Sequence, residues 1–213
     1  MHLEKYIDHT LLKSTASEAE ILQLCKEAIE YKFYAVCVNG CYVKTCKKAL
    51  HKSEIKIASV IGFPLGAMST KAKIFEAEDC INNGADEIDM VINIGWLKSG
   101  EIEKVTSEIK KIKEAVGNKI LKVIIETCYL TDEEKKIACK AAIDAKADYV
   151  KTSTGFGPEG ASIKDVVLMM LAVDGKAKIK ASGGIRDAIT ATEYIDLGVS
   201  RIGTSSGIKI VTT

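Results

Sequence analysis

Short apolar segments alternate with longer amphipathic segments along almost the whole chain, and this alternation restricts the possible folds more than any other feature. In the first amphipathic segment, Ile21, Leu24 and Ala28 recur at helical spacing. Ser17 and Glu20 form a helix-capping pattern just before them. Strands that alternate with helices of this length form right-handed β-α-β units, and such units build a parallel sheet. The sequence therefore predicts an α/β protein.

The expected strands are short and follow one another at regular intervals. Residues 6–12 form an apolar run that a polar triplet interrupts, and this run fits either a first strand or a loop. The seven other expected strands are 33–39, 56–62, 87–93, 120–126, 149–152, 178–181 and 201–203. Helices are expected between them at 43–50, 70–82, 101–116, 165–173 and 187–197, and after the N-cap residues Ser17 and Thr131.

Eight such units in 213 residues fit a (β/α)₈ barrel, the TIM-barrel fold. A doubly wound sheet is the alternative, but it would place a G-x-G-x-x-G pattern after the first strand, and the sequence has none there. The glycine-bearing loops at Gly155, Gly183, Gly184 and Gly203 follow the last three expected strands, where phosphate-binding barrels hold their anion. We therefore expect one barrel domain over residues 1–213.

The composition argues against several classes of partner. Thirty basic residues face 29 acidic ones, so the net charge of +1 gives no reason to expect nucleic acid or a membrane surface as partner. No apolar run approaches the roughly 18 residues that span a bilayer, and the N-terminus lacks the layout of a signal peptide. Seven cysteines without a C-x-x-C pair, together with three histidines, favour reduced thiols over disulfides or a metal site. We expect a cytoplasmic protein.

The segment 148–157, DYVKTSTGFG, combines a reactive group with an anion cradle. Lys151 ends an apolar strand, and burial disfavours the charged form of an amine. A neutral amine is a nucleophile toward carbonyl groups, as in lysines that form Schiff bases. The hydroxyl groups and free backbone N–H groups of residues 152–155 suit a phosphate.

Strand side chains alternate between the two faces of a sheet, so one set fills the barrel interior. By this count five strands direct a titratable group inward, namely Cys37, Asp89, Glu126, Lys151 and Lys180. Each group also has a structural interpretation: Asp89 could pair with a cation, Lys180 could reach solvent, Cys37 could pack in the core, and Glu126 could tie loops together. Their convergence favours function, because a second ammonium disfavours protonation of Lys151 and Asp89 can exchange protons with Lys180.

Several long motifs resemble the deoxyribose-phosphate aldolase family. The clearest are DYVKTSTGF at 148–156, KASGGIR at 180–186 and RIGTSS at 201–206. The segments IDHTLL at 7–12, CVN at 37–39, GFPLG at 62–66 and EIDMVIN at 87–93 are similar as well. The resemblance extends from about residue 6 to about residue 210.

The resemblance implies a class I aldolase that needs neither metal nor cofactor and works on a (β/α)₈ barrel. It would interconvert 2-deoxy-D-ribose 5-phosphate with acetaldehyde and D-glyceraldehyde 3-phosphate in deoxyribose phosphate catabolism. Lys151 matches the Schiff-base lysine, and Lys180 and Asp89 match the proton-transfer pair. The positions that match the phosphate site and the substrate pocket are Asp8, Thr10, Cys37, Thr154, Gly155, Gly183, Gly184, Gly203, Ser205 and Ser206. Some members carry a lysine where this chain has Phe156, and we expect a homo-oligomer, either a dimer or a tetramer.

Two other functions fit the same residues. A different Schiff-base aldolase, of the transaldolase or keto-acid type, would share Lys151 but accept another donor. A non-catalytic sugar-phosphate sensor would keep the phosphate loops, but it would have little use for Lys151, Lys180 and Asp89 together. A screen of donor substrates would distinguish the first alternative from the deoxyribose-phosphate aldolases. Binding of a sugar phosphate without turnover would indicate the second.

Overall fold

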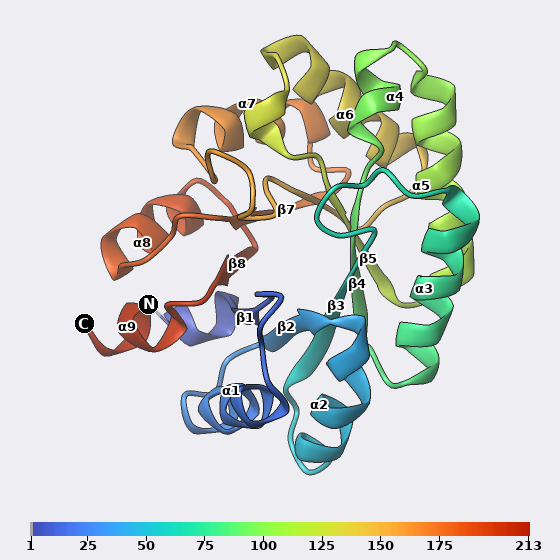
Figure 1. Ribbon diagram of the computed structural model, residues 1–213. Helices are drawn as coiled ribbons and strands as arrows, with labels where there is room; N and C mark the ends of the chain where they lie inside the picture. Colours follow the sequence, from blue (N-terminus) through green and yellow to red (C-terminus); the bar gives the residue numbers. More distant parts are fainter. Residues whose placement is uncertain (1) are drawn as a thin grey trace.

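Eight parallel strands close into a barrel in a computed structural model that describes residues 2–213 (Figure 1). Each strand pairs with its neighbours in the sequence, and the last pairs with the first. The predicted (β/α)₈ fold is therefore confirmed, and residues 6–12 do contain the first strand. The strands are β1 (Ile7–Leu11), β2 (Ala35–Asn39), β3 (Lys56–Ile61), β4 (Glu87–Val91), β5 (Ile120–Ile124), β6 (Tyr149–Lys151), β7 (Lys178–Ser182) and β8 (Arg201–Thr204).

The helices surround the barrel, and short 3₁₀ turns cover Leu3–Tyr6, Gly40–Tyr42 and Thr127–Tyr129 (Figure 1). Ser17 and Thr131 form the capping boxes that their sequences predict. The helices are α1 (Glu18–Glu30), α2 (Val43–Ala49), α3 (Thr70–Asn82), α4 (Ile94–Lys98), α5 (Ile102–Val116), α6 (Asp132–Asp144), α7 (Ile163–Val173), α8 (Ala188–Asp196) and α9 (Gly207–Thr212).

Two expected strands end two residues earlier than predicted because the chain turns. The strand expected at 87–93 ends at Val91, since the Asn93 side chain accepts a hydrogen bond from the Trp96 N–H at 3.1 Å and caps α4. The strand expected at 120–126 ends at Ile124, and Glu126 adopts a left-handed backbone conformation with φ of 54°. Both side chains therefore lie in loops above the barrel.

Strand register brings the inward side chains together. Across the sheet, Lys151 of β6 is in register with Lys180 of β7, and Lys180 is in register with Arg201 of β8. Asp89 of β4 is in register with Lys122 of β5. Because residues in register on adjacent parallel strands point to the same face, the pairing directs all of these charged groups into the barrel interior.

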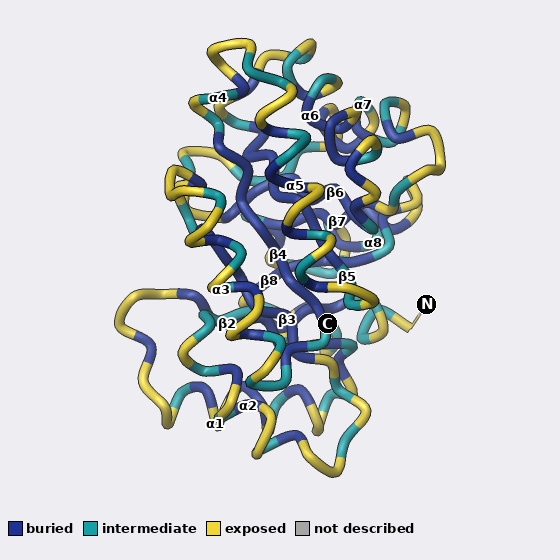
Figure 2. The backbone as a smooth tube through the Cα atoms, turned by 90° about the vertical axis from the view of Figure 1, so that its right-hand side faces the viewer, coloured by how far each residue is buried: buried dark blue, intermediate teal, exposed yellow. Residues whose placement is uncertain are grey.

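The apolar core divides into two parts, as the alternation predicts. The large part lies between the sheet and the helices, so the strands are buried and the outer helix faces are exposed (Figure 2). It contains the predicted helix-facing residues Val36, Val38, Ile88, Met90, Ile92, Val123, Ile125, Val150, Ile179 and Ala181. A small separate cluster of Leu12, Cys37, Ala58 and Val60 comes from the opposite strand face. The opposite orientations of Cys37 and its neighbours Val36 and Val38 confirm the predicted faces of β2.

One buried ion pair lies in the outer layer. Lys73 of α3 contacts Glu108 of α5 at 2.8 Å and also donates to the carbonyl oxygen of Val91 at 2.8 Å. Neither charged side chain is exposed. This pair joins two helices to the end of β4. Among residues 2–213, no helix is both long enough and apolar enough to cross a membrane.

Candidate active site

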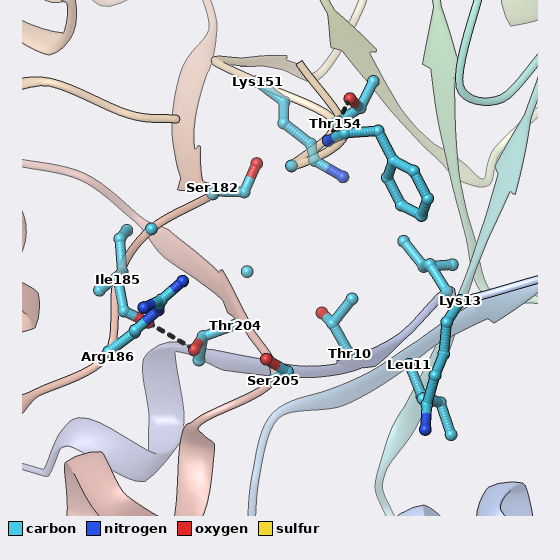
Figure 3. A pocket seen from close by; sticks show the side chains of 16 residues that line it. Thr10, Leu11, Lys13, Lys151, Thr154, Ser182, Ile185, Arg186, Thr204 and Ser205 are labelled. Atoms are coloured by element: carbon cyan, nitrogen blue, oxygen red, sulfur yellow. Dashed lines mark hydrogen bonds between the residues drawn. The ribbon is translucent and has the colours of Figure 1, made fainter. Parts of the chain in front are cut away.

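A cavity of about 350 Å³ opens at the carboxyl ends of β1, β6, β7 and β8 (Figure 3). In barrels of this fold, active sites are built at this end of the strands. The cavity is lined by residues 10–13, Lys151, residues 154–156, residues 182–186 and residues 203–205. It therefore brings together the Lys151 segment and the two glycine-bearing loops that follow β7 and β8.

Lys151 is the reactive group that reaches this cavity. Its Nζ donates a hydrogen bond to Oδ2 of Asp89 at 2.8 Å, and Lys180 Nζ donates to the same oxygen at 2.8 Å. Asp89 and Lys180 are fully buried and do not line the cavity, whereas Lys151 does. Both predicted catalytic lysines thus contact Asp89, and Lys151 stands between the other two residues and any bound ligand.

The carboxylate of Asp89 also has a partner deeper in the barrel. Lys122 Nζ donates to the other carboxylate oxygen, Oδ1, at 2.7 Å and lies 2.5 Å from Glu87 Oε2. Arg201 then makes two hydrogen bonds to Glu87, of 2.9 and 3.1 Å. Its guanidinium group also stacks over the ring of Tyr34 with 3.6 Å to the ring centre.

A second series of contacts leads from Arg201 through Asp8 and Lys180 back to Asp89. Arg201 Nε donates to Oδ1 of Asp8 at 2.7 Å, and Oδ2 of Asp8 accepts a hydrogen bond from Lys180. Lys180 in turn contacts Asp89, so the contacts close on themselves. We call this set the charge ring; in order around it, the members are Asp8, Lys180, Asp89, Lys122, Glu87 and Arg201.

The charge ring stabilises the ionised state of Asp8, Asp89 and Lys180. Burial alone would raise the pKa of Asp8, but the charges of Arg201 and Lys180 outweigh it and lower the pKa to about 2. Burial alone would likewise raise the pKa of Asp89, and the surrounding lysines hold that pKa well below its usual range. For Lys180, burial favours the neutral amine, yet the carboxylates of Asp8 and Asp89 raise its pKa above the ordinary value. Lys180 is therefore an ammonium and Asp89 a carboxylate.

Two residues expected in the substrate pocket are buried behind the cavity and are not part of its lining. Asp8 is fully buried in the charge ring and does not line the cavity, because both of its oxygens are used by Arg201 and Lys180. Cys37 is also fully buried, packs in the small apolar cluster, and has its pKa raised by burial. Thr10, from β1, does line the cavity.

Most of the other expected substrate-pocket and phosphate positions line the cavity. They are Thr154, Gly155, Gly183, Gly184, Gly203 and Ser205. Gly183 has φ of 86°, and a Cβ there would lie 2.9 Å from the Cα of Gly160, so the loop after β7 requires glycine at this position. Ser206 is not part of the lining; its backbone N–H donates to Thr204 Oγ1 at 2.9 Å.

Glu126 fits its structural interpretation. Its carboxylate accepts hydrogen bonds from the backbone N–H of Thr154 at 3.1 Å and from the Thr154 hydroxyl group. It therefore fastens the loop after β6 to the loop after β5. The adjacent Phe156 is 54% exposed and packs edge-on against Phe63 with 5.2 Å between ring centres.

Sequence reasoning missed several residues of the site. Lys122, Glu87 and Arg201 complete the charge ring. The signal was available for two of them, because Lys122 has the same strand parity as Glu126 on the expected strand 120–126, and Glu87 has that of Asp89. Ser182, Thr204 and Arg186 line the cavity as well, and all three lie inside the motifs that carry the resemblance. The Thr204 hydroxyl group donates to the Ile185 carbonyl at 2.7 Å (Figure 3).

A barrel with a buried lysine at the carboxyl ends of its strands is the architecture of a Schiff-base aldolase. The chain matches the model of the DeoC/LacD family aldolases over residues 3–211 and therefore belongs to that family. The deoxyribose-phosphate aldolase of Finegoldia magna is 56% identical over 211 residues, which are 99% of each chain. That of Caldicellulosiruptor saccharolyticus is 56% identical over 212 residues, 98% of this chain and 96% of the relative.

Solved structures agree with this assignment. A putative deoxyribose-phosphate aldolase from Coccidioides immitis superposes with a TM-score of 0.97 at 41% identity, covering 99% of this chain and 84% of that one. The tetrameric deoxyribose phosphate aldolase from Aeropyrum pernix superposes with a TM-score of 0.90 at 32% identity, covering 98% and 89% of the two chains.

Acid should destabilise the protein through Asp8. Its carboxyl group takes up a proton at its ordinary pKa of 3.8 in the unfolded chain but only near pH 2 in the folded one. The stabilisation is therefore complete above pH 3.8 and is lost as the pH falls to about 2. Urea unfolding over this range should show a falling free energy of unfolding.

The control is Asp8→Asn. This variant should be less stable near neutral pH, because it leaves Arg201 and Lys180 short of one counter-charge. Its free energy of unfolding should then depend less steeply on pH in the acid range. An equally steep dependence would show that Asp8 does not contribute.

Proposed function

We propose that the chain is an aldolase that reversibly cleaves 2-deoxy-D-ribose 5-phosphate into D-glyceraldehyde 3-phosphate and acetaldehyde through a Schiff base on Lys151. One observation carries this proposal: Lys151 lines the cavity, and its amine donates a hydrogen bond of 2.8 Å to the buried carboxylate of Asp89. The names of the full-length relatives support the choice of substrate.

The first chemical step is attack on the sugar aldehyde. The neutral amine of Lys151 adds to C1 of the open-chain sugar phosphate, and loss of water gives a protonated imine. This cation withdraws electrons from the C2–C3 bond, so covalent catalysis divides one difficult carbanion step into easier ones. The hydrogen bond to Asp89 fixes the direction of the amine before attack.

Proton transfer is the role we propose for Lys180 and Asp89. Removal of the proton from the 3-hydroxyl group releases glyceraldehyde 3-phosphate and leaves an enamine on Lys151. Protonation of that enamine at C2 and hydrolysis of the imine then give acetaldehyde and the free lysine. Because Lys180 and Asp89 lie behind Lys151, a water molecule in the cavity would carry protons between them and the substrate.

The phosphate would lie against the loops after β6, β7 and β8. Backbone N–H groups of Gly155, Gly183 and Gly184 offer the anion hydrogen bonds, as do Gly203, Ser205 and the nearby Ser206. Arg186 and Lys13, both exposed at the cavity, add positive charge. These two residues would supply part of what other members obtain from the lysine that Phe156 replaces.

We further propose that residues 1–213 form one barrel domain, that the protein is cytoplasmic, and that it is a homo-oligomer without nucleic-acid or membrane partners. The seven free cysteines suit a reducing compartment. Phe75, Leu171 and Ile189 are each about three-quarters exposed, at 74%, 77% and 75%, which suits surfaces that another subunit covers. The Aeropyrum pernix relative is a tetramer.

Replacing Lys151 with arginine tests the proposed function. Arginine keeps a positive charge but stays protonated and cannot form an imine, so Lys151→Arg should lose at least about 10³-fold in kcat for 2-deoxy-D-ribose 5-phosphate. The matched control is Lys176→Arg, a lysine with a 64% exposed side chain, which should retain full activity. Normal turnover by Lys151→Arg would show that Lys151 is not the nucleophile. A wild-type protein that binds the sugar phosphate without turnover would instead indicate a sensor.

A carboxylate at position 205 tests the phosphate site. In Ser205→Asp the new charge would face the phosphate across the cavity, and like charges at about 4 Å repel by about 1 kcal/mol in water, so KM for the sugar phosphate should rise about fivefold at similar kcat. KM for unphosphorylated 2-deoxyribose should change little. Ser200→Asp, at the opposite end of β8, is the matched control. Equal effects on both substrates would place the phosphate elsewhere.

A further inference from the structure

We propose that Glu87 and Lys122 are positioning residues that keep Lys151 in its nucleophilic form, because the charge ring to which they belong is electrically complete without a charge on Lys151. Neither residue lines the cavity. The inference rests on the proposed function and extends it, because it assigns a role to two buried charges that the reaction itself does not use.

The charge ring contains equal numbers of opposite charges in alternating order. Its anions are Asp8, Asp89 and Glu87, and each lies between two cations. Its cations are Lys180, Lys122 and Arg201, and each lies between two anions. All six side chains are at most 2% exposed. Charges buried this deeply are tolerated only when they are paired, and in the ring every one is.

Lys151 is attached to the charge ring but is not needed to close it. Its only bond to the ring is to Oδ2 of Asp89, an oxygen that already accepts a hydrogen bond from Lys180. An ammonium group on Lys151 would add one positive charge to a neutral cluster at 3% exposure of its side chain. A neutral amine makes the same hydrogen bond to Asp89 without that cost. The charge balance of the ring therefore does not require a charge on Lys151.

The other groups around Lys151 do not change the net charge of its surroundings. Cys37 on β2 is a neutral thiol because burial raises its pKa, and the inward residues of β3, Ala58 and Val60, are apolar. Glu126, in the loop after β5, directs its carboxylate to Thr154. β6 also directs Tyr149 inward, a neutral phenol because burial raises its pKa. The buried titratable groups that face inward from the other strands are ring members: Asp8 from β1, Glu87 and Asp89 from β4, Lys122 from β5, Lys180 from β7 and Arg201 from β8.

Glu87 and Lys122 allow the ring charge to be changed without altering the cavity. Glu87 precedes Asp89 by two residues on β4 and therefore lies about 7 Å deeper along the strand. Lys122 reaches Lys151 only through Asp89, which it contacts at the oxygen that Lys151 does not use. Substitutions at these two positions should act on Lys151 through charge.

The test is the pH dependence of imine formation in Glu87→Gln, in Lys122→Met and in the double variant. Acetaldehyde is the substrate and cyanoborohydride traps the imine, because an unphosphorylated aldehyde adds no titrating group of its own. Lys122→Met leaves the ring with one excess negative charge, so the acid limb of the trapping rate should move up by about 1 pH unit. Glu87→Gln leaves one excess positive charge and should move it down by about as much. The double variant restores neutrality and should return the limb to the wild-type position.

The matched control is Glu108→Gln, which removes an equally buried carboxylate from its pair with Lys73 in the outer layer. This variant should lose stability without moving the acid limb. If one single variant fails to fold, the other single variant and the neutral double variant still decide the question. Shifts in the same direction, no shift, or a double variant that stays displaced would overturn the inference. Absence of trapping in the wild-type protein would instead contradict the proposed function.

Discussion

The carboxylate of Asp89 is the contact on which the interior of this barrel depends. It accepts hydrogen bonds from Lys151 and Lys180 on one oxygen and from Lys122 on the other. A buried carboxylate with no partner would be costly, and so would each buried lysine. Removing Asp89 would therefore leave three amino groups without their shared acceptor. Placing them around one anion makes it possible for a protein interior to hold several cations beside a substrate cavity.

The closed parallel sheet is what makes this arrangement possible. Each charged residue lies on a different strand from its partners, and closure brings the first strand beside the last, so Asp8 contacts Arg201 although 193 positions separate them in the chain. Parallel strands also end at one rim, where the loops after β6, β7 and β8 meet over Lys151 (Figures 1 and 3). The charge ring lies below that rim, and the cavity lies among the loops of the rim.

The sequence predicts the parts of this structure that depend on local patterns. The alternation of strands and helices predicts the barrel, and the two-residue period of strand side chains predicts that Lys151, Lys180 and Asp89 share its interior. Contacts between strands could not be predicted in the same way, because no local pattern states that Glu87 contacts Arg201. Ends of strands were also missed where a side chain caps the next turn, as Asn93 does, or where the backbone turns left-handed, as at Glu126. The resemblance placed Asp8 and Cys37 at the substrate, and in the structure both side chains are fully buried and outside the cavity lining.

The central claim is that Lys151 forms the covalent intermediate, and reductive trapping tests it most directly. The wild-type protein would be incubated with acetaldehyde and borohydride, digested, and mapped by peptide mass spectrometry. The account predicts one ethyl group on one peptide, located on Lys151. No adduct, or ethyl groups spread over the exposed lysines, would contradict the account.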